Sequence, residues 1–165
     1  MSSSIHKERT AAVITVSDSC ARGERVDLSG PAVANSLRKA EFSIVGTEIV
    51  ADERAAIEKA IVYWAGESRL VVTTGGTGIA ERDVTPEATR HICERLLDGV
   101  VERMRFEGAK KTPLAALSRG VCGVRQRSLI LNLPGSPTGA VDSLESVIGI
   151  IPHALDLLAG NTSHS

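Results

Sequence analysis

Aromatic side chains are scarce in this sequence of 165 residues, which holds one tryptophan, one tyrosine and two phenylalanines. Proteins that bind single-stranded nucleic acids stack the bases on aromatic side chains, so the composition disfavours that class. An excess of charge is also lacking, because 19 basic and 20 acidic residues leave a net charge of −1. Nucleic acids and anionic membrane surfaces are therefore not expected as partners.

Cysteines are few, and long apolar runs are missing. Cys20, Cys93 and Cys122 are widely spaced and form no Cys-x-x-Cys pair, which disfavours a disulfide framework and a thiolate zinc site. No apolar run reaches the length needed to span a membrane. The first ten residues are polar and charged, unlike a signal peptide. We therefore expect a cytoplasmic protein.

The length predicts one domain, large enough to bury about two-thirds of its unfolded surface. Strand-like segments alternate with helix-like ones, which predicts a mostly parallel sheet covered by helices on both faces. Two short strands, 121–124 and 128–133, are expected to pair with each other across a tight turn. The domain is expected over 11–160, between flexible tails at 1–10 and 161–165.

Turn residues and apolar spacing place the individual elements. Helix N-caps are expected at Ser29, Asp52, Thr85 and Ser136, whose side chains can accept a hydrogen bond from the first helical turn. The last helix should bend near Pro152, because proline removes a helix hydrogen bond. A long polar loop is expected at 18–31, and loops of this length are usually functional or disordered. Strands are predicted over 11–17, 42–50, 70–74, 121–124 and 128–133, and helices over 31–40, 53–66, 86–97, 99–109, 114–119 and from 137 onward.

The stretch 70–87 is the most informative part of the chain. An uncharged apolar strand leads into Gly75-Gly76-Thr77-Gly78, and Asp83 follows. Glycines permit positive φ and close approach of a ligand, and successive N–H groups in such a loop can bind an anion. The loop is not a known nucleotide fingerprint, since Glu81 stands where a dinucleotide motif needs Gly or Ala, and no Gly-Lys-Ser/Thr follows. By itself it is as compatible with a plain turn as with a phosphate site.

Polar residues follow each predicted strand, and parallel strands open their carboxyl ends on one edge. Asp18, Asp52, Asp83 and Ser136 are therefore expected to converge. Each also has a structural interpretation: Asp52 and Ser136 as helix caps, Asp18 as a turn residue and Asp83 as the partner of a neighbouring arginine. Carboxylates beside an anion-binding loop would repel phosphate unless a hard cation lay between them, and Mg²⁺ is commonly held by one or two carboxylates plus substrate phosphates. Together the residues predict phosphoryl or nucleotidyl transfer, which depends on positioning and charge neutralisation.

Several motifs resemble the molybdenum-cofactor biosynthesis family of MogA and MoaB type. The segment Thr73-Thr74-Gly75-Gly76-Thr77-Gly78, followed by Arg82-Asp83-Val84-Thr85-Pro86-Glu87-Ala88, is similar to the signature of that family. Segments 17–31, 117–120 and 132–137 agree with it, and the form of the last one favours the MoaB type. The resemblance runs from about residue 11 to residue 158.

This resemblance implies a three-layer α/β/α fold and a homo-oligomer, with a trimer expected and a hexamer as the second possibility. It implies adenylyl transfer, in which the terminal phosphate of molybdopterin attacks the α-phosphate of Mg²⁺-bound ATP and pyrophosphate is released. Asp52 and Asp83 match the two acids that hold the metal and the transferring phosphate.

The residues implied to bind molybdopterin and nucleotide lie in the matching segments, and Ser118 and Arg119 among them are expected to contact phosphate. The whole set is Ser17, Asp18, Ser29, Gly30, Thr74, Gly75, Gly76, Thr77, Gly78, Glu87, Ser118, Arg119, Pro134, Gly135 and Ser136. The alternative function is a molybdopterin carrier or MoaB-like paralogue without adenylyltransferase activity. A scaffold or an oxidoreductase is disfavoured, since the chain has no linker for the first and lacks the dinucleotide fingerprint for the second.

Overall fold

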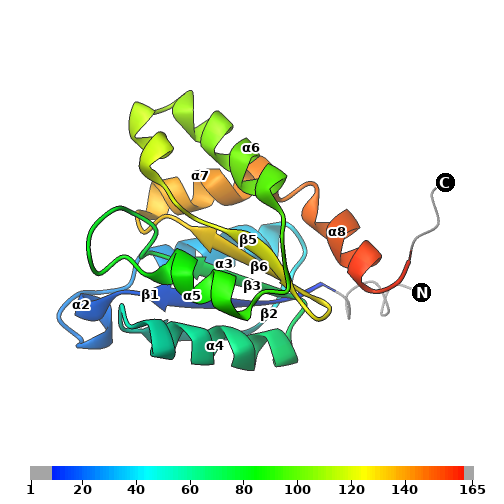
Figure 1. The fold of residues 1–165 in the computed structure, drawn as a ribbon, viewed down its shortest axis with the longest axis horizontal. Coiled ribbons are helices and arrows are strands. Elements are labelled where there is room, and N and C mark those ends of the chain that lie inside the picture. Colours follow the sequence, from blue (N-terminus) through cyan, green and yellow to red (C-terminus); the bar gives the residue numbers. More distant parts are fainter. Residues whose placement is uncertain (1–8, 162–165) are drawn as a thin grey trace.

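The computed structural model describes residues 9–161, which form a six-stranded sheet with helices on both faces (Figure 1). Most of the two predicted tails, 1–8 and 162–165, lies outside the described residues, and the first strand already begins at Thr10. In spatial order the strands are β2 (Ser43–Val50), β1 (Thr10–Val16), β3 (Leu70–Thr74), β6 (Ser128–Leu133), β5 (Cys122–Arg125) and β4 (Arg95–Leu96).

Four neighbouring strands, β2, β1, β3 and β6, run parallel, and β5 runs antiparallel to both β6 and β4. All residues of β3 and β6 are buried, which agrees with their uncharged apolar sequences. The predicted class, a mostly parallel sheet with a short antiparallel edge pair, is therefore confirmed. The parallel strands end on one edge, which positions the loops discussed below.

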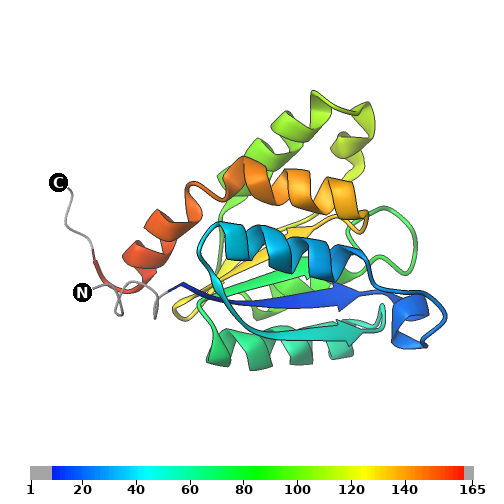
Figure 2. The same cartoon turned by 180° about the vertical axis from the view of Figure 1, so that it is seen from behind.

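Helices cover the sheet in two layers. On one face lie α3 (Ser29–Lys39) and α7 (Pro137–Val147), with α6 (Asp98–Ala109) and α8 (Ile151–Leu158) beside α7 (Figures 1 and 2). On the other face lie α4 (Arg54–Glu67) and α5 (Thr85–Ile92). The predicted three-layer α/β/α arrangement results.

The core is built from aliphatic side chains on both faces, as the scarcity of aromatics requires. Leu70 and Val72 face the layer of α3 and α7, and Val71 faces α4 and α5. Trp64 is half-buried on α4 and fills the space above Gly46, where any side chain would run into its ring. In the described part of the chain, no helix is both long and apolar enough to cross a bilayer.

Three of the four predicted helix N-caps are wrong, and Ser136 alone is confirmed by a bond from the N–H of Gly139 to its hydroxyl. The N-cap positions of α3, α4 and α5 are Leu28, Glu53 and Val84, none of which makes a side-chain cap bond. The side chains of Ser29, Asp52 and Thr85 instead bond to other loops of the carboxyl edge. Tertiary partners outcompete the local caps at these helix starts.

Two helices differ from the prediction in extent. The helix expected over 86–97 ends at Ile92, because the N–H groups of Glu94 and Leu97 donate to carbonyls of β5 and add β4 to the sheet. The last helix does not bend but breaks, and α8 begins at Ile151 with Pro152 in its first turn. The polar loop 18–31 also holds a short helix, α2 (Asp18–Ala21), with Ser17 as its N-cap.

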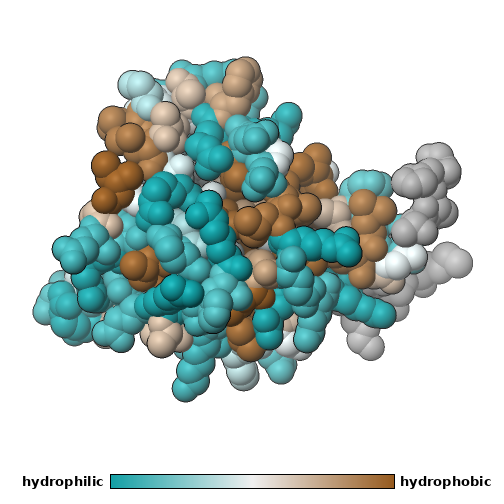
Figure 3. Space-filling model, viewed as in Figure 1, coloured by the Kyte–Doolittle hydropathy of each residue, from teal (hydrophilic) through white to brown (hydrophobic). Residues whose placement is uncertain are grey.

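Apolar side chains lie exposed where α6 ends and the following 3-10 helix (Pro113–Leu117) begins. Phe106 and Leu114 are 67% and 68% exposed, and Leu117 is 49% exposed. A hydrophobic area covers this end of the molecule in the space-filling view (Figure 3). An exposed cluster of this kind is typical of a surface that contacts another protein chain.

Ile130 lies fully buried in β6 and tests the packing of the sheet against α4 and α5. The change Ile130→Ala should lower the free energy of unfolding by about 2–5 kcal/mol, because it removes buried methyl groups and leaves a cavity. Ile79, which is 71% exposed, provides the matched control, and Ile79→Ala should stay within about 0.5 kcal/mol. Urea unfolding followed by circular dichroism measures both, and equal losses would contradict this packing.

Candidate active site

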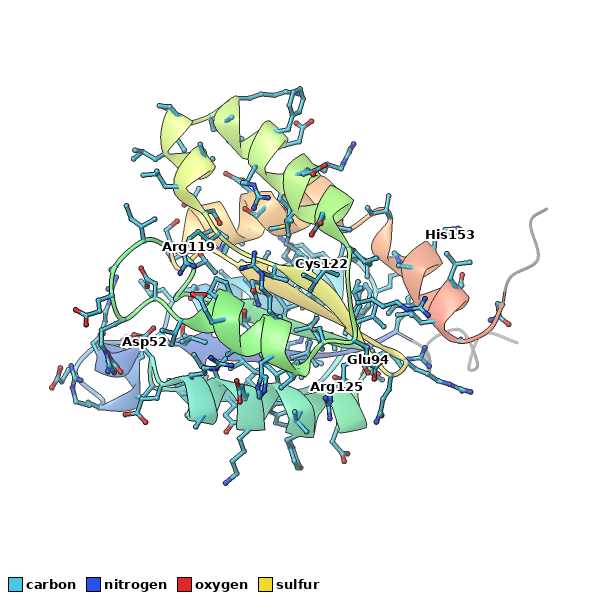
Figure 4. All side chains as sticks on the ribbon, in the orientation of Figure 1. Asp52, Glu94, Arg119, Cys122, Arg125 and His153 are labelled. Carbon is cyan, nitrogen blue, oxygen red and sulfur yellow. The ribbon has the colours of Figure 1, made fainter. Side chains whose placement is uncertain are left out.

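A cavity of roughly 370 Å³ opens at the carboxyl edge of the parallel strands. Asp52 lies at this end of the sheet in Figure 4. The loops after β1, β2, β3 and β6 all contribute to the cavity, as expected from the element order. Its lining residues are Thr15, Val16, Ser17, Cys20, Arg25, Val26, Asp27, Leu28, Ser29, Asp52, Thr74, Gly75, Gly76, Asp83, Gly135, Ser136 and Pro137.

The floor of the cavity is the glycine turn after β3. Gly75 and Gly76 have φ values of +95° and +68°, which side-chain-bearing residues rarely adopt. The Thr85 hydroxyl donates to the Gly75 carbonyl at 3.0 Å, and the N–H of Gly75 donates to Leu133 at 3.0 Å. A side chain at Gly135 would contact Gly75, so the loops after β3 and β6 lie against each other.

Arg119 closes the rest of the glycine loop from the outside. Its Nε donates to the Gly78 carbonyl at 2.7 Å, and its Nη2 donates to the Asp83 carbonyl at 2.8 Å. Its Nη1 pairs with both Glu87 oxygens, at 2.8 and 3.1 Å. The backbone N–H of Arg119 also donates to Thr77 at 2.8 Å. Arg119 and Glu87, which are predicted to contact substrate, therefore bind each other, and Arg119 also binds the loop backbone.

Asp52 is partly buried at the end of β2, and its carboxylate bonds to a neighbouring loop. The N–H of Asp18 donates to Asp52 Oδ2 at 2.9 Å, and the N–H of Asp52 donates to Asp18 Oδ1 at 2.9 Å. Asp52 Oδ1 lies against Gly76, close to where a side chain would stand. Burial raises the pKa of Asp52, and the negative charges of Asp18 and Asp83 raise it further.

Asp18 has the opposite electrostatic environment. The hydrogen bond from the Asp52 backbone lowers the pKa of Asp18, and the guanidinium of Arg82 lowers it further. Arg82 binds both oxygens, with Nε to Oδ2 at 2.9 Å and Nη2 to Oδ1 at 2.8 Å. The Asp18 carboxylate is thus occupied by groups of the chain itself.

Asp83 lines the same cavity as Asp52. Its Oδ2 accepts a hydrogen bond from the N–H of Ala80 at 3.0 Å, which closes a tight turn in the glycine loop. Among the described residues, no group of three or more His, Cys, Asp or Glu side chains is arranged to hold a metal ion. Asp52 and Asp83 both line the cavity, and a cation held by two carboxylates would keep further coordination positions for water or substrate oxygens.

A second polar cluster supports the wall formed by the loop after β1. Thr15 donates to Asp27 Oδ2 at 2.7 Å, and the N–H of Gly30 donates to Asp27 Oδ1 at 3.0 Å. Gly30 is packed so closely against these two side chains that no side chain would fit there. Ser29 shares a 2.8 Å hydrogen bond with Thr74, which ties α3 to the end of β3.

The structure brings nine of the predicted residues to one cavity and places the others around it. Thr77 and Gly78 belong to the outer part of the glycine loop, Asp18 and Gly30 support the wall, and Ser118 and Pro134 line a neighbouring cavity. The nine lining residues are Ser17, Ser29, Asp52, Thr74, Gly75, Gly76, Asp83, Gly135 and Ser136.

The neighbouring cavity, of roughly 330 Å³, lies between α6, α7 and the 3-10 helix. Its walls include Val101 and Met104 together with Arg105 and Lys111. Ser136 lines both cavities, so the two are adjacent. A ligand could extend from one to the other past the start of α7.

Besides Thr15 of β1, sequence reasoning missed three polar residues of the main cavity: Cys20, Arg25 and Asp27. Arg25 is exposed and brings a positive charge to a wall that otherwise carries carboxylates. All three lie in the polar loop 18–31, whose unusual length was the available signal.

These features define an open three-layer α/β/α protein of the class that binds ligands at the carboxyl ends of parallel strands. Residues 12–153 match the family described as "Probable molybdopterin binding domain". The chain therefore belongs to this family, as its motifs suggested.

Known relatives extend over nearly the whole chain. It is 46% identical to a molybdopterin adenylyltransferase of Helicobacter pylori, over 90% of this chain and 87% of that protein. The solved structure of the molybdopterin biosynthesis enzyme MoaB from Thermus thermophilus is 50% identical, with a TM-score of 0.87 over 92% of this chain and 96% of that one. The tungsten cofactor synthesizing protein MoaB from Pyrococcus furiosus is 32% identical, with a TM-score of 0.83 over 90% and 96% of the two chains.

The glycine turn gives a direct test of the backbone geometry. Gly75→Ala should lower the free energy of unfolding by about 1–3 kcal/mol or more, because the new methyl group would collide with the Val16 carbonyl at a positive φ. Gly66 lies in α4 with open space around it, so Gly66→Ala should stabilise the protein by about 0.5–1 kcal/mol. Denaturant titrations should show changes of opposite sign; equal signs would contradict the geometry.

The three thiols should differ in reactivity. Burial raises the pKa of Cys122 to about 12 and that of Cys93 to about 11, so very little thiolate exists at pH 8. Cys20 is partly exposed and lines the cavity. Iodoacetamide at pH 8 should label Cys20 first in the folded protein, as read by peptide mass spectrometry. Labelling of Cys122 at the rate of Cys20 would contradict the burial.

Proposed function

We propose that this protein is a molybdopterin adenylyltransferase of molybdenum-cofactor biosynthesis. The observation that carries the proposal is the convergence of Asp52, Asp83 and the Gly75–Gly76 turn in one cavity. The similarity to a relative named for this activity supports the same reaction.

In the proposed reaction, a phosphate oxygen of molybdopterin forms a bond to the α-phosphorus of ATP. The bond between the α-phosphorus and the bridging oxygen to the β-phosphate breaks, and pyrophosphate leaves with the electron pair. The nucleophile is already an anion, so the protein needs no strong general base. The main requirements are alignment of the two phosphates and neutralisation of their charges.

Asp52 and Asp83 fit a Mg²⁺ ion, because both carboxylates line one cavity; burial raises the pKa of Asp52, and the negative charges of Asp18 and Asp83 raise it further. When bound, Mg²⁺ would neutralise phosphate charge and polarise the α-phosphate. Because the N–H of Gly75 donates to Leu133, the N–H groups that follow it in the glycine turn would orient phosphate oxygens, and the exposed guanidinium of Arg25 would offset further negative charge.

We also propose that the protein assembles as a homotrimer, with a hexamer as the alternative assembly. The exposed side chains of Phe106, Leu114 and Leu117 support an association surface. Size-exclusion chromatography with light scattering would measure the assembly, and a monomer at micromolar concentration would contradict it.

The catalytic assignment predicts that Asp52→Asn and Asp83→Asn each reduce ATP-dependent pyrophosphate release by roughly 100- to 1,000-fold. That range is typical when one electrostatic contact to a transition state is lost. The assay contains purified protein, Mg²⁺, ATP and molybdopterin. Wild-type turnover in either variant would contradict the assignment of that residue.

Asp156 supplies a matched control, because it is an exposed aspartate in α8 at the opposite end of the molecule. Asp156→Asn should release pyrophosphate at the wild-type rate. If wild-type protein binds molybdopterin tightly but releases no pyrophosphate, the chain is a carrier or an inactive paralogue.

A further inference from the structure

Three loops of the carboxyl edge are joined by one chain of hydrogen bonds. Arg82, in the loop after β3, binds both carboxylate oxygens of Asp18, in the loop after β1. Asp18 in turn exchanges two backbone-to-carboxylate bonds with Asp52, after β2. These hydrogen bonds therefore connect the glycine loop, through Asp18, to Asp52.

One end of this hydrogen-bonded connection is Asp52, and the other is Arg82, the neighbour in sequence of Asp83. Arg82 directly precedes Asp83, and its side chain reaches across to a residue 64 positions earlier in the sequence. A bidentate arginine–carboxylate pair fixes orientation as well as distance, because two parallel bonds must form together. The position of Asp52 relative to Asp83 is thus set partly through the Arg82 side chain and through Asp18, which lies in a third loop.

We propose that Arg82 and Asp18 are positioning residues that hold Asp52 near Asp83 in the cavity for shared binding of a divalent cation. The proposal deepens the proposed adenylyl transfer and rests on it, because adenylyl transfer is what gives Asp52 and Asp83 a reason to share a cation. The Arg82–Asp18–Asp52 connection itself rests on the geometry alone. Neither residue needs to touch the substrate in this role.

A purely structural ion pair would behave differently. The Arg82 side chain is 60% exposed, and exposed ion pairs contribute little to stability. Loss of Arg82 should therefore shift the melting temperature by no more than about 3 °C. Residues that orient metal ligands, in contrast, typically change metal affinity or activity by 10- to 100-fold.

The test uses the full-length Arg82→Gln variant beside Arg54→Gln. Arg54 is a matched control, since it is a half-exposed arginine that pairs with Glu58 at 2.8 Å and lies outside the connection. The first readout is hydrogen exchange at the N–H groups of Asp18 and Asp52, measured by NMR without substrate. Exchange at both should rise at least about 10-fold in Arg82→Gln and stay unchanged in Arg54→Gln.

The second readout is the Mg²⁺ concentration that gives half-maximal pyrophosphate release, which should rise about 10- to 100-fold in Arg82→Gln. Unchanged hydrogen exchange would overturn the connection, whether or not the enzyme is active. Raised exchange with unchanged Mg²⁺ dependence would overturn the positioning role. If the wild-type protein releases no pyrophosphate, the proposed function fails, and Mn²⁺ binding measured by electron paramagnetic resonance decides the positioning role instead.

Two further variants separate positioning from charge. Arg82→Lys keeps the positive charge but cannot form two parallel hydrogen bonds to Asp18. Its Mg²⁺ concentration for half-maximal pyrophosphate release should therefore be close to that of Arg82→Gln. Combining Arg82→Gln with Asp18→Asn should cost no more than the larger single change, because both act through one connection. Full rescue by lysine, or additive effects in the double variant, would overturn the proposal.

Discussion

At the end of β3 the backbone turns through Gly75 and Gly76 with positive φ, and three other segments take their positions from that turn. Gly135 packs directly on Gly75, Thr85 binds the Gly75 carbonyl, and Asp52 lies against Gly76. A side chain at Gly76 would collide with Thr85 and Asp52, and one at Gly75 would collide with the Val16 carbonyl. The cavity therefore depends on a backbone conformation that only glycine adopts without strain.

Negative charge is distributed unevenly around this turn. The Asp18 carboxylate is neutralised by Arg82, and Glu87 is neutralised by Arg119. Asp52 is partly dehydrated and has no arginine bonded to its carboxylate, so its pKa is raised. The acids at the margin thus serve the scaffold, while the carboxylates of Asp52 and Asp83 face the cavity. A site of this kind suits a cation brought in with phosphate.

The sequence predicted the layers of the fold well, because uncharged runs such as Leu70–Thr74 can be satisfied only in a buried strand. It also located the carboxyl edge, since Ser136 and the glycines follow strands directly. It failed where a side chain had two competing partners. Asp52 has the right type and position for a helix cap, but bonds to Asp18, 34 residues away in sequence. The strand Arg95–Leu96 has two exposed residues and no pattern to detect.

Arg119 illustrates why residue type and motif do not determine role. An arginine beside a phosphate-binding loop is a natural candidate for phosphate contact, yet three of its nitrogens are committed to the loop and to Glu87. The loop 77–83 has few hydrogen bonds of its own, so it needs such a tie to hold Asp83 in place. Arg119 fixes this loop from one side, and Arg82 ties it to Asp18 on the other. Because Arg82 and Arg119 bind the scaffold, the charge of a phosphate in the proposed reaction would be offset by Arg25 and by a cation held at Asp52 and Asp83.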